Sequence, residues 1–89
     1  MMAKDKTKRV IDGDTFTTQG GNTIRLANVD TPEKGERGAP QARKDLIKLI
    51  SRKPITVEPV ARDKYGRIVA NVKVVNKSVN NTMRKKGWK

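Results

Sequence analysis

The chain has 89 residues, 21 Lys and Arg against 9 Asp and Glu, no His, no Cys, and a formal net charge of +12. We predict a single domain over residues 1–89, because globular domains rarely divide at this length. Triads with His, Cys nucleophiles, His or Cys zinc sites and disulfides are excluded, so any metal ion must be held by oxygen.

The N-terminal residues 1–6 contain no apolar segment of the kind found in secretory signals, and no apolar stretch is long enough to span a membrane. We therefore expect no membrane association. The expected location is cytoplasmic, or secreted if a signal was removed. The hydrophobic fraction of 34% predicts a small core. Its periodic spacing argues against a disordered basic tail.

The first half of the chain has the pattern of strands. Residues 10–18 favour strand and are interrupted by Asp12-Gly13-Asp14, which predicts a strand bent or bulged at Gly13. Turn-forming residues at 19–22 precede an alternating segment at 23–29, and together they predict a hairpin. Residues 30–40 are rich in Pro, Gly and charged side chains, which predicts an irregular loop. Loops of this length often carry functional residues.

A helix is predicted next. Pro40 suits its first turn, apolar residues recur at helical spacing over 42–50, and Pro54 ends it. The alternating residues 55–60 predict a strand, and Pro59 places that position at an edge or near the strand's end.

The last third predicts one more strand and a short helix. Residues 67–75 alternate with one apolar face. Ser78 is a candidate N-cap for a helix that carries Val79 and Met83 inward and is closed by Gly87.

This order of elements is that of an OB-fold. The predicted fold class is mainly β (α+β), a five-stranded OB-fold barrel with a helix after strand 3 and a short C-terminal helix. A minimal SH3-like barrel, the alternative, would not need the first helix.

The few carboxylates of so basic a chain are its most informative residues. Five of the nine fall in three short segments at turns or strand ends: Asp12, Asp14, Asp30, Glu33 and Asp63. Plain solvated turn residues are the alternative. If the first three strands form a meander, Asp14 and Asp30 come within reach of each other, and a pair of carboxylates suits a hard cation, Ca²⁺ or Mg²⁺.

Three blocks of sequence closely resemble the signature blocks of the staphylococcal nuclease (thermonuclease) family. They are residues 10–15 (VIDGDT), 24–33 (IRLANVDTPE) and 63–67 (DKYGR), in the family's order and spread over nearly the whole chain. The resemblance implies a Ca²⁺-dependent phosphodiesterase on an OB-fold, a monomer whose substrate is single-stranded DNA or RNA.

The resemblance also implies roles for individual residues. Asp14 and Asp30 would be carboxylate ligands of Ca²⁺, and Thr31 would supply a backbone carbonyl. Glu33 would take a proton from the attacking water or orient it. The two guanidinium groups that would flank the phosphate are those of Arg25 and Arg67.

Four further residues have supporting roles. Lys64 and Tyr65 match positions that contact a nucleotide phosphate, although Tyr65 could instead be an aromatic lid on the barrel. Asp12 and Asp63 are expected to organise turns by side-chain hydrogen bonds, or to lie near the metal without binding it. Ordinary solvated charges on a strand face remain the alternative for the two arginines.

Family members commonly continue past the Gly of the second helix into a third helix with another substrate-contacting Tyr, whereas this chain ends at Lys89. The loop between Glu33 and Pro40 is also shorter than in the best-known member. We therefore expect a smaller core and a weaker grip on substrate.

Two further interpretations stay open beside the enzyme. One is a catalytically weak or inactive OB-fold module that holds nucleic acid by charge, and the other is a fragment without activity. Single-strand-binding OB-folds stack bases on aromatic side chains, and this chain offers only Phe16, Tyr65 and Trp88. That scarcity favours the enzyme.

Overall fold

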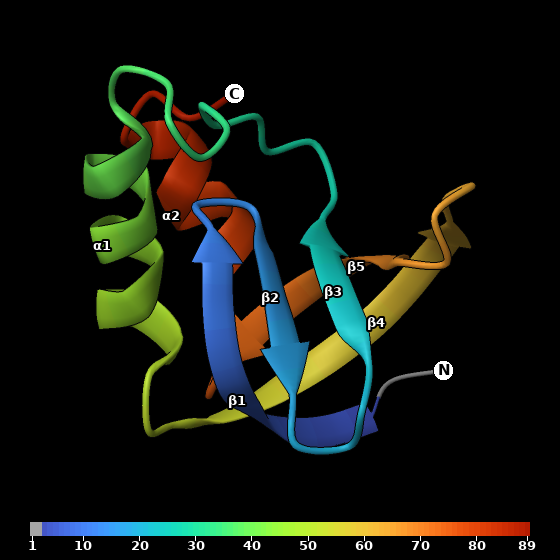
Figure 1. The fold of residues 1–89 in the computed structure, drawn as a ribbon. Coiled ribbons are helices and arrows are strands. Elements are labelled where there is room, and N and C mark those ends of the chain that lie inside the picture. The colour runs from blue at the N-terminus through green and yellow to red at the C-terminus, as the bar shows by residue number, and fades with distance from the viewer. Residues whose placement is uncertain (1–2) are drawn as a thin grey trace.

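The computed structural model describes residues 3–89. It consists of a six-stranded sheet that curls into a barrel, with two helices packed beside it (Figure 1). The segment 1–6 was expected to contain no secretory signal. Its first two residues lie outside the described residues. The elements are β1 (Ala3–Asp12), β2 (Thr15–Thr18), β3 (Thr23–Leu26), α1 (Ala39–Ile50), β4 (Pro54–Arg62), β5 (Ile68–Val74), β6 (Lys77–Ser78) and α2 (Val79–Lys85).

The barrel closes through a parallel pairing between β3 and β5. The strands follow the order β3-β2-β1-β4-β5-β6, and Arg25 of β3 lies opposite Val69 of β5. The other strand pairings of residues 3–89 are antiparallel. The predicted fold class, a mainly β barrel with a helix after the third strand and a short C-terminal helix, is confirmed.

The segment around Gly13 is a tight turn, and the prediction of one bent strand there is wrong. Asp12 pairs with Thr15 in the antiparallel ladder of β1 and β2, so Gly13 and Asp14 form a two-residue connection. The strand β1 also begins at Ala3 rather than near residue 10. Its first half pairs with β4, with Ala3 opposite Val57. Its side chains are mostly exposed and charged, so they give no apolar alternation to detect.

The helix α1 forms as predicted. It follows Gly38, whose φ is 88°, and has Pro40 in its first turn. One face buries four residues against the barrel: Ala39, Ala42, Leu46 and Ile50.

Pro59 lies at an irregularity in the pairing of β4 with β5. Within the described residues 3–89, β1 pairs with β4 from Lys6–Pro54 to Ala3–Val57, and Pro59 pairs with Ala70 of β5. The prediction that Pro59 lies at an edge or near the strand's end stays a prediction.

The helix α2 is capped as predicted, because the Ser78 side chain accepts a hydrogen bond from the Asn81 N–H at 3.1 Å. Val79 and Met83 are buried in the barrel core. Neither α1 nor α2, within the described part of the chain, is long and apolar enough to cross a membrane.

Asn80 is a polar residue inside this core, with no exposed surface. Its Oδ1 accepts a hydrogen bond from the Val72 N–H at 2.8 Å. Its Nδ2 donates to the carbonyls of Ala27 at 3.0 Å and Ala70 at 3.1 Å. One side chain thus ties α2, β5 and the end of β3 together. Nδ2 donates to two carbonyls, and Oδ1 accepts one hydrogen bond and has one lone pair left.

We predict that Asn80→Ala lowers the free energy of unfolding by about 3 kcal/mol, because it leaves buried backbone groups without partners. Asn81→Ala, the same change at the exposed neighbouring position, is the control and should cost less than about 1 kcal/mol. Urea unfolding followed by circular dichroism measures both. Equal losses would show that the buried amide is not what ties these elements together.

Candidate active site

The turn between β1 and β2 lies against α1 and the loop that follows β3. A Cβ on Gly13 would lie 2.6 Å from the Ala42 Cβ and 2.9 Å from the Thr31 Cγ2. Only a residue without a side chain allows this approach. Gly13 therefore brings Asp14 next to Thr31, although the two residues come from different parts of the chain.

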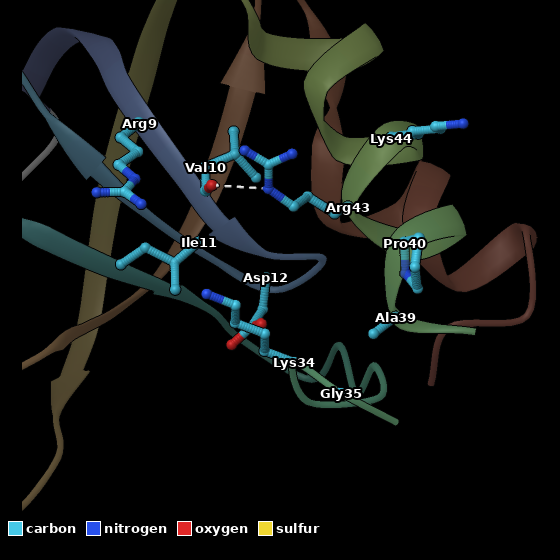
Figure 2. A pocket seen from close by; sticks show the side chains of 10 residues that line it. All are labelled: Arg9, Val10, Ile11, Asp12, Lys34, Gly35, Ala39, Pro40, Arg43 and Lys44. Atoms are coloured by element: carbon cyan, nitrogen blue, oxygen red, sulfur yellow. Dashed lines mark hydrogen bonds between the residues drawn. The ribbon is translucent and has the colours of Figure 1, made fainter. Parts of the chain in front are cut away.

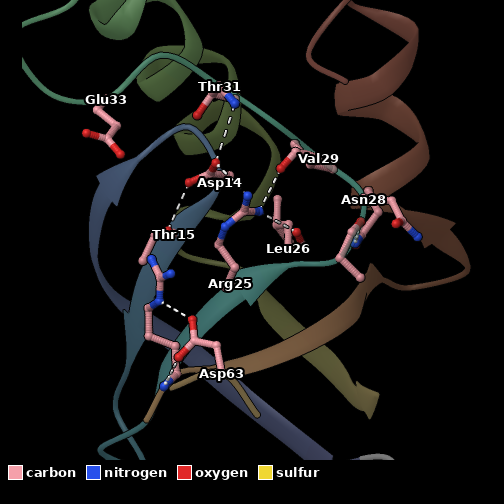
Figure 3. A network of polar contacts seen from close by, with 12 residues as sticks. Asp14, Thr15, Arg25, Leu26, Asn28, Val29, Thr31, Glu33 and Asp63 are labelled. Atoms are coloured by element: carbon pink, nitrogen blue, oxygen red, sulfur yellow. Dashed lines mark hydrogen bonds and ion pairs between the residues drawn. The ribbon is translucent and has the colours of Figure 1, made fainter. Parts of the chain in front are cut away.

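Asp14 is buried and has polar partners on both carboxylate oxygens (Figure 3). Oδ1 accepts a hydrogen bond from the Thr15 hydroxyl at 2.9 Å. Oδ2 accepts a long one from the Thr31 N–H at 3.4 Å and lies 3.4 Å from Arg25 Nη2. A buried carboxylate needs such partners, because its ionised form is costly to remove from water.

Arg25 is held in place by backbone carbonyls as well as by this ion pair. Its Nη1 donates to the carbonyl of Leu26 at 2.7 Å and to that of Val29 at 2.6 Å. The chain leaves β3 through Asn28, whose φ is 58°, and this turn brings Val29 back toward the guanidinium. Arg25 is therefore positioned before any ligand arrives.

An open cleft of about 690 Å³ lies beside this group and is lined by Asp30, Thr31, Pro32, Glu33, Glu36 and Arg37. Asp30 and Glu33 are both exposed. The loop carries Glu33 on the same side of the barrel as Asp14 and Thr31 (Figure 3). The four residues expected to bind metal or activate water therefore lie in or beside this cleft: Asp14, Asp30, Thr31 and Glu33.

Two residues of this cleft, Glu36 and Arg37, were missed by the sequence analysis. The Glu36 carboxylate accepts a hydrogen bond from the Glu33 N–H at 2.6 Å, and the Glu36 N–H donates to the Glu33 carbonyl at 2.9 Å. The Glu-x-x-Glu spacing with an intervening Gly is a turn signal that could have revealed them. This turn fixes the backbone of Glu33.

Asp63, Tyr65 and Arg67 form a second cluster, at the hairpin between β4 and β5. Asp63 Oδ2 accepts a hydrogen bond from Arg67 Nε at 2.6 Å, and Oδ1 accepts from the N–H groups of Tyr65 and Arg67. Partial desolvation raises the pKa of Asp63, but these hydrogen bonds and the Arg67 charge outweigh it and hold the pKa below its usual value. Asp63 therefore organises the turn, as expected.

The remaining predicted site residues, Lys64, Tyr65 and Asp12, lie outside the cleft that Asp30 and Glu33 line. The Tyr65 ring is 73% exposed, with Lys64 Nζ 5.3 Å and the Arg67 guanidinium 5.4 Å from its centre. It is therefore not a lid on the barrel. Asp12 lines a different cleft, and its side chain accepts no hydrogen bond within residues 3–89, so the expected Asx-type turn is not formed there.

A hard divalent cation fits the oxygen atoms found here. Among the residues that the structure describes, Thr31 Oγ1 is buried without a hydrogen-bond partner, on the residue whose N–H approaches the Asp14 carboxylate. Carboxylate and carbonyl oxygens are the ligands preferred by Ca²⁺ and Mg²⁺. Within the described residues, no three carboxylates converge on one metal position. The protein could therefore supply only a thin ligand set.

Comparison with known proteins gives matches over most of the chain. The family model of staphylococcal nuclease homologues matches residues 23–88. A Haemophilus influenzae protein named an uncharacterized endonuclease is 34% identical over 83 residues, covering 89% of this chain and 47% of that protein.

Two enterobacterial relatives match a shorter stretch. A Shigella flexneri micrococcal nuclease is 34% identical over 67 residues, covering 72% of this chain and 38% of that protein. An Escherichia coli uncharacterized endonuclease is 37% identical over 67 residues, covering 72% of this chain and 44% of that protein. The chain thus spans less than half the length of these relatives.

The family match contains Arg25, Asp30, Thr31, Glu33 and Arg67, whereas Asp14 precedes it and is brought to the same place by the fold. By sequence and by architecture, the chain belongs to the family of staphylococcal nuclease homologues.

Proposed function

We propose that this chain is a Ca²⁺-dependent nuclease domain that hydrolyses phosphodiester bonds of single-stranded DNA or RNA and acts as a monomer. The observation that carries the proposal is the convergence of Asp14, Arg25 and Thr31 beside the cleft lined by Asp30 and Glu33. The nuclease names of its relatives support the same reaction class.

Asp14, Asp30 and the carbonyl of Thr31 would hold the ion. When bound, Ca²⁺ would supply positive charge that stabilises the negative charge developing on the phosphoryl oxygens. Hydrolysis of a phosphodiester builds that charge in the transition state, so a preorganised site favours it over the ground state.

The Arg25 guanidinium would also stabilise the negative charge that develops on the phosphoryl oxygens. Its guanidinium is fixed by two carbonyls and Asp14, so little reorganisation is needed when a phosphate arrives. Arg67 would act differently, because Asp63 already occupies its Nε. It retains its terminal amino groups for phosphate oxygens, and its planar shape suits binding two of them at once.

Glu33 is proposed as the general base. Without His or Cys in the chain, a carboxylate is the side chain best able to accept a proton from water near neutral pH. Glu33 is exposed in the cleft, and the turn with Glu36 holds its backbone. An attacking water in the cleft can therefore reach it from solvent.

The second candidate is a binding module without catalysis. One observation favours it: the exposed Tyr65 ring, flanked by Lys64 and Arg67, could stack on a base while the cations hold phosphates. Absence of cleavage by a folded protein that binds both nucleic acid and Ca²⁺ would establish this alternative.

Replacing Glu33 by Gln keeps size and hydrogen bonding but removes basicity. We expect the single-turnover rate in Ca²⁺ to fall by about 10²–10⁴ while nucleotide affinity changes little. Glu58→Gln, the same change at an exposed position of β4, is the control. Cleavage by Glu33→Gln at the parental rate would refute the general-base role.

Arg67→Ala gives the contrast within the same experiment. It should also lower turnover, by about 10²–10³ if its loss resembles that of one transition-state donor. Unlike Glu33→Gln, it should weaken nucleotide binding as well, because it removes a positive charge that faces the phosphate.

Metal binding gives a prediction that needs no turnover. With few protein ligands, Ca²⁺ affinity should be weak alone and tighter with a bound nucleotide whose phosphate completes the coordination. Asp30→Ala should abolish the calorimetric Ca²⁺ response, whereas Glu58→Ala should retain it. Tight Ca²⁺ binding without nucleotide, or an unchanged response in Asp30→Ala, would contradict the proposed ligand set.

Nucleic-acid affinity should depend steeply on salt, because a chain of net charge +12 releases counterions when it binds phosphates. If about four to six phosphates are contacted, log K should fall with log salt with a slope of about −3 to −4 on a single strand. Fluorescence anisotropy in the presence of a chelator measures this slope without cleavage. A flat dependence would remove the electrostatic account of substrate capture.

A further inference from the structure

A second hollow surface runs between β1 and α1, across the loop of residues 33–36 from the candidate active site. Two neighbouring clefts of about 370 and 590 Å³ are both lined by Arg9, Val10 and Arg43, and together they are here called the β1–α1 groove. One of the two is drawn in Figure 2, where Arg43 reaches from α1 to the Val10 carbonyl, its Nε donating at 3.0 Å.

The groove is strongly basic. Its lining contains one carboxylate, that of Asp12, and seven cationic side chains, those of Lys6, Lys8, Arg9, Lys34, Arg43, Lys44 and Arg52. Within residues 3–89 the ion pairs are Arg25–Asp14 and Arg67–Asp63, so none of the seven is paired with a carboxylate. Gathering like charges on one surface costs free energy unless an anion binds there.

The same loop forms one wall of the groove and one wall of the active-site cleft. Lys34 and Gly35 line the groove, whereas their neighbours Glu33 and Glu36 line the cleft. Asp12 similarly borders the groove, two residues before Asp14. A strand that crosses this loop therefore passes directly from the cleft into the groove.

The size and lining of the groove indicate what it can hold. A hollow of about 370 Å³ falls within the range of small-molecule sites, about 300–1,000 Å³, so it suits a few linked nucleotides rather than a duplex. Ile11, 41% exposed, adds an apolar contact beside the cations. This combination of a cationic track with some apolar surface suits a flexible single strand.

We propose that the β1–α1 groove binds the phosphate backbone of the same single-stranded nucleic acid whose cleaved bond lies at the candidate active site. The proposal rests on the proposed function for the identity of that polymer. It makes the groove a subsite for nucleotides beyond the loop of residues 33–36, which a short substrate cannot reach.

The test compares single-stranded oligothymidylates of about 4 and about 16 nucleotides by fluorescence anisotropy in a chelator over a salt series. Arg9→Gln with Lys44→Gln removes two exposed groove cations whose side chains make no hydrogen bond within the described residues 3–89. This pair should weaken binding of the longer strand about tenfold at physiological salt and reduce its salt slope by about 1.4. Binding of the short strand should stay unchanged.

Lys73→Gln with Lys77→Gln is the matched control, because it removes two exposed charges on β5 and β6, outside the groove. Its effect on the longer strand should be less than about twofold, from the change in net charge alone. Lys8→Gln with Lys44→Gln repeats the test with a second groove pair, and circular dichroism confirms folding.

Equal losses in the groove and control pairs, equal losses on both strand lengths, or no tighter binding of the longer strand would each overturn the groove proposal. These measurements require no cleavage. A parent protein that shows the expected binding pattern but never cleaves would refute the proposed nuclease function and support the groove.

Discussion

The parallel ladder between β3 and β5 is the constraint on which the barrel and both arginines depend. It pairs Ile24 with Ile68, Arg25 with Val69 and Leu26 with Ala70. Because side chains alternate along a strand, burial of Ile24 and Leu26 in the core leaves Arg25 facing outward between them. Arg67 directly precedes β5, so the same ladder holds the hairpin of residues 63–67 beside β3. Closing the barrel thus brings together two basic residues that are far apart in the sequence.

Close packing at Gly13 adds the acidic side of the site. Since a Cβ there would collide with the side chains of Ala42 and Thr31, the turn can lie directly on α1 and on the loop after β3. The helix α1 thereby packs behind Asp14, and its own cations Arg43 and Lys44 line the β1–α1 groove instead of the candidate active site. The sequence pattern predicted a strand bent or bulged at Gly13, whereas the structure has a tight turn there that closely approaches α1. A reader of the sequence has no way to see which residue lies opposite a glycine.

Features with strong local signals could be predicted from the sequence. Proline and helical periodicity marked α1, and Ser78 marked the start of α2. Features that depend on distant partners could not be predicted: the first half of β1 is set by pairing with β4, and Asn80 bonds to Ala27, 53 residues earlier in the chain. At the candidate site, motifs indicated the residues that converge, but not that Arg67 is already paired with Asp63. Their roles in metal binding and catalysis remain predictions.

The distribution of paired and unpaired charge distinguishes the two surfaces. At the candidate active site, Arg25 and Arg67 are paired with carboxylates, and the Arg25 guanidinium also donates to two backbone carbonyls. Their geometry is fixed at the expense of some of their attraction for phosphate. In the β1–α1 groove, seven cations have no carboxylate partner in the described residues and keep their attraction for phosphate, and of these Arg43 is held in place by a hydrogen bond to the Val10 carbonyl. Chemistry needs the first arrangement, because a transition state tolerates little displacement, whereas capture of a flexible polymer needs only the second. A polyanion that occupies the groove would also relieve the repulsion among its cations. It would stabilise the small core to the extent that the folded groove binds it more tightly than the equally charged unfolded chain does.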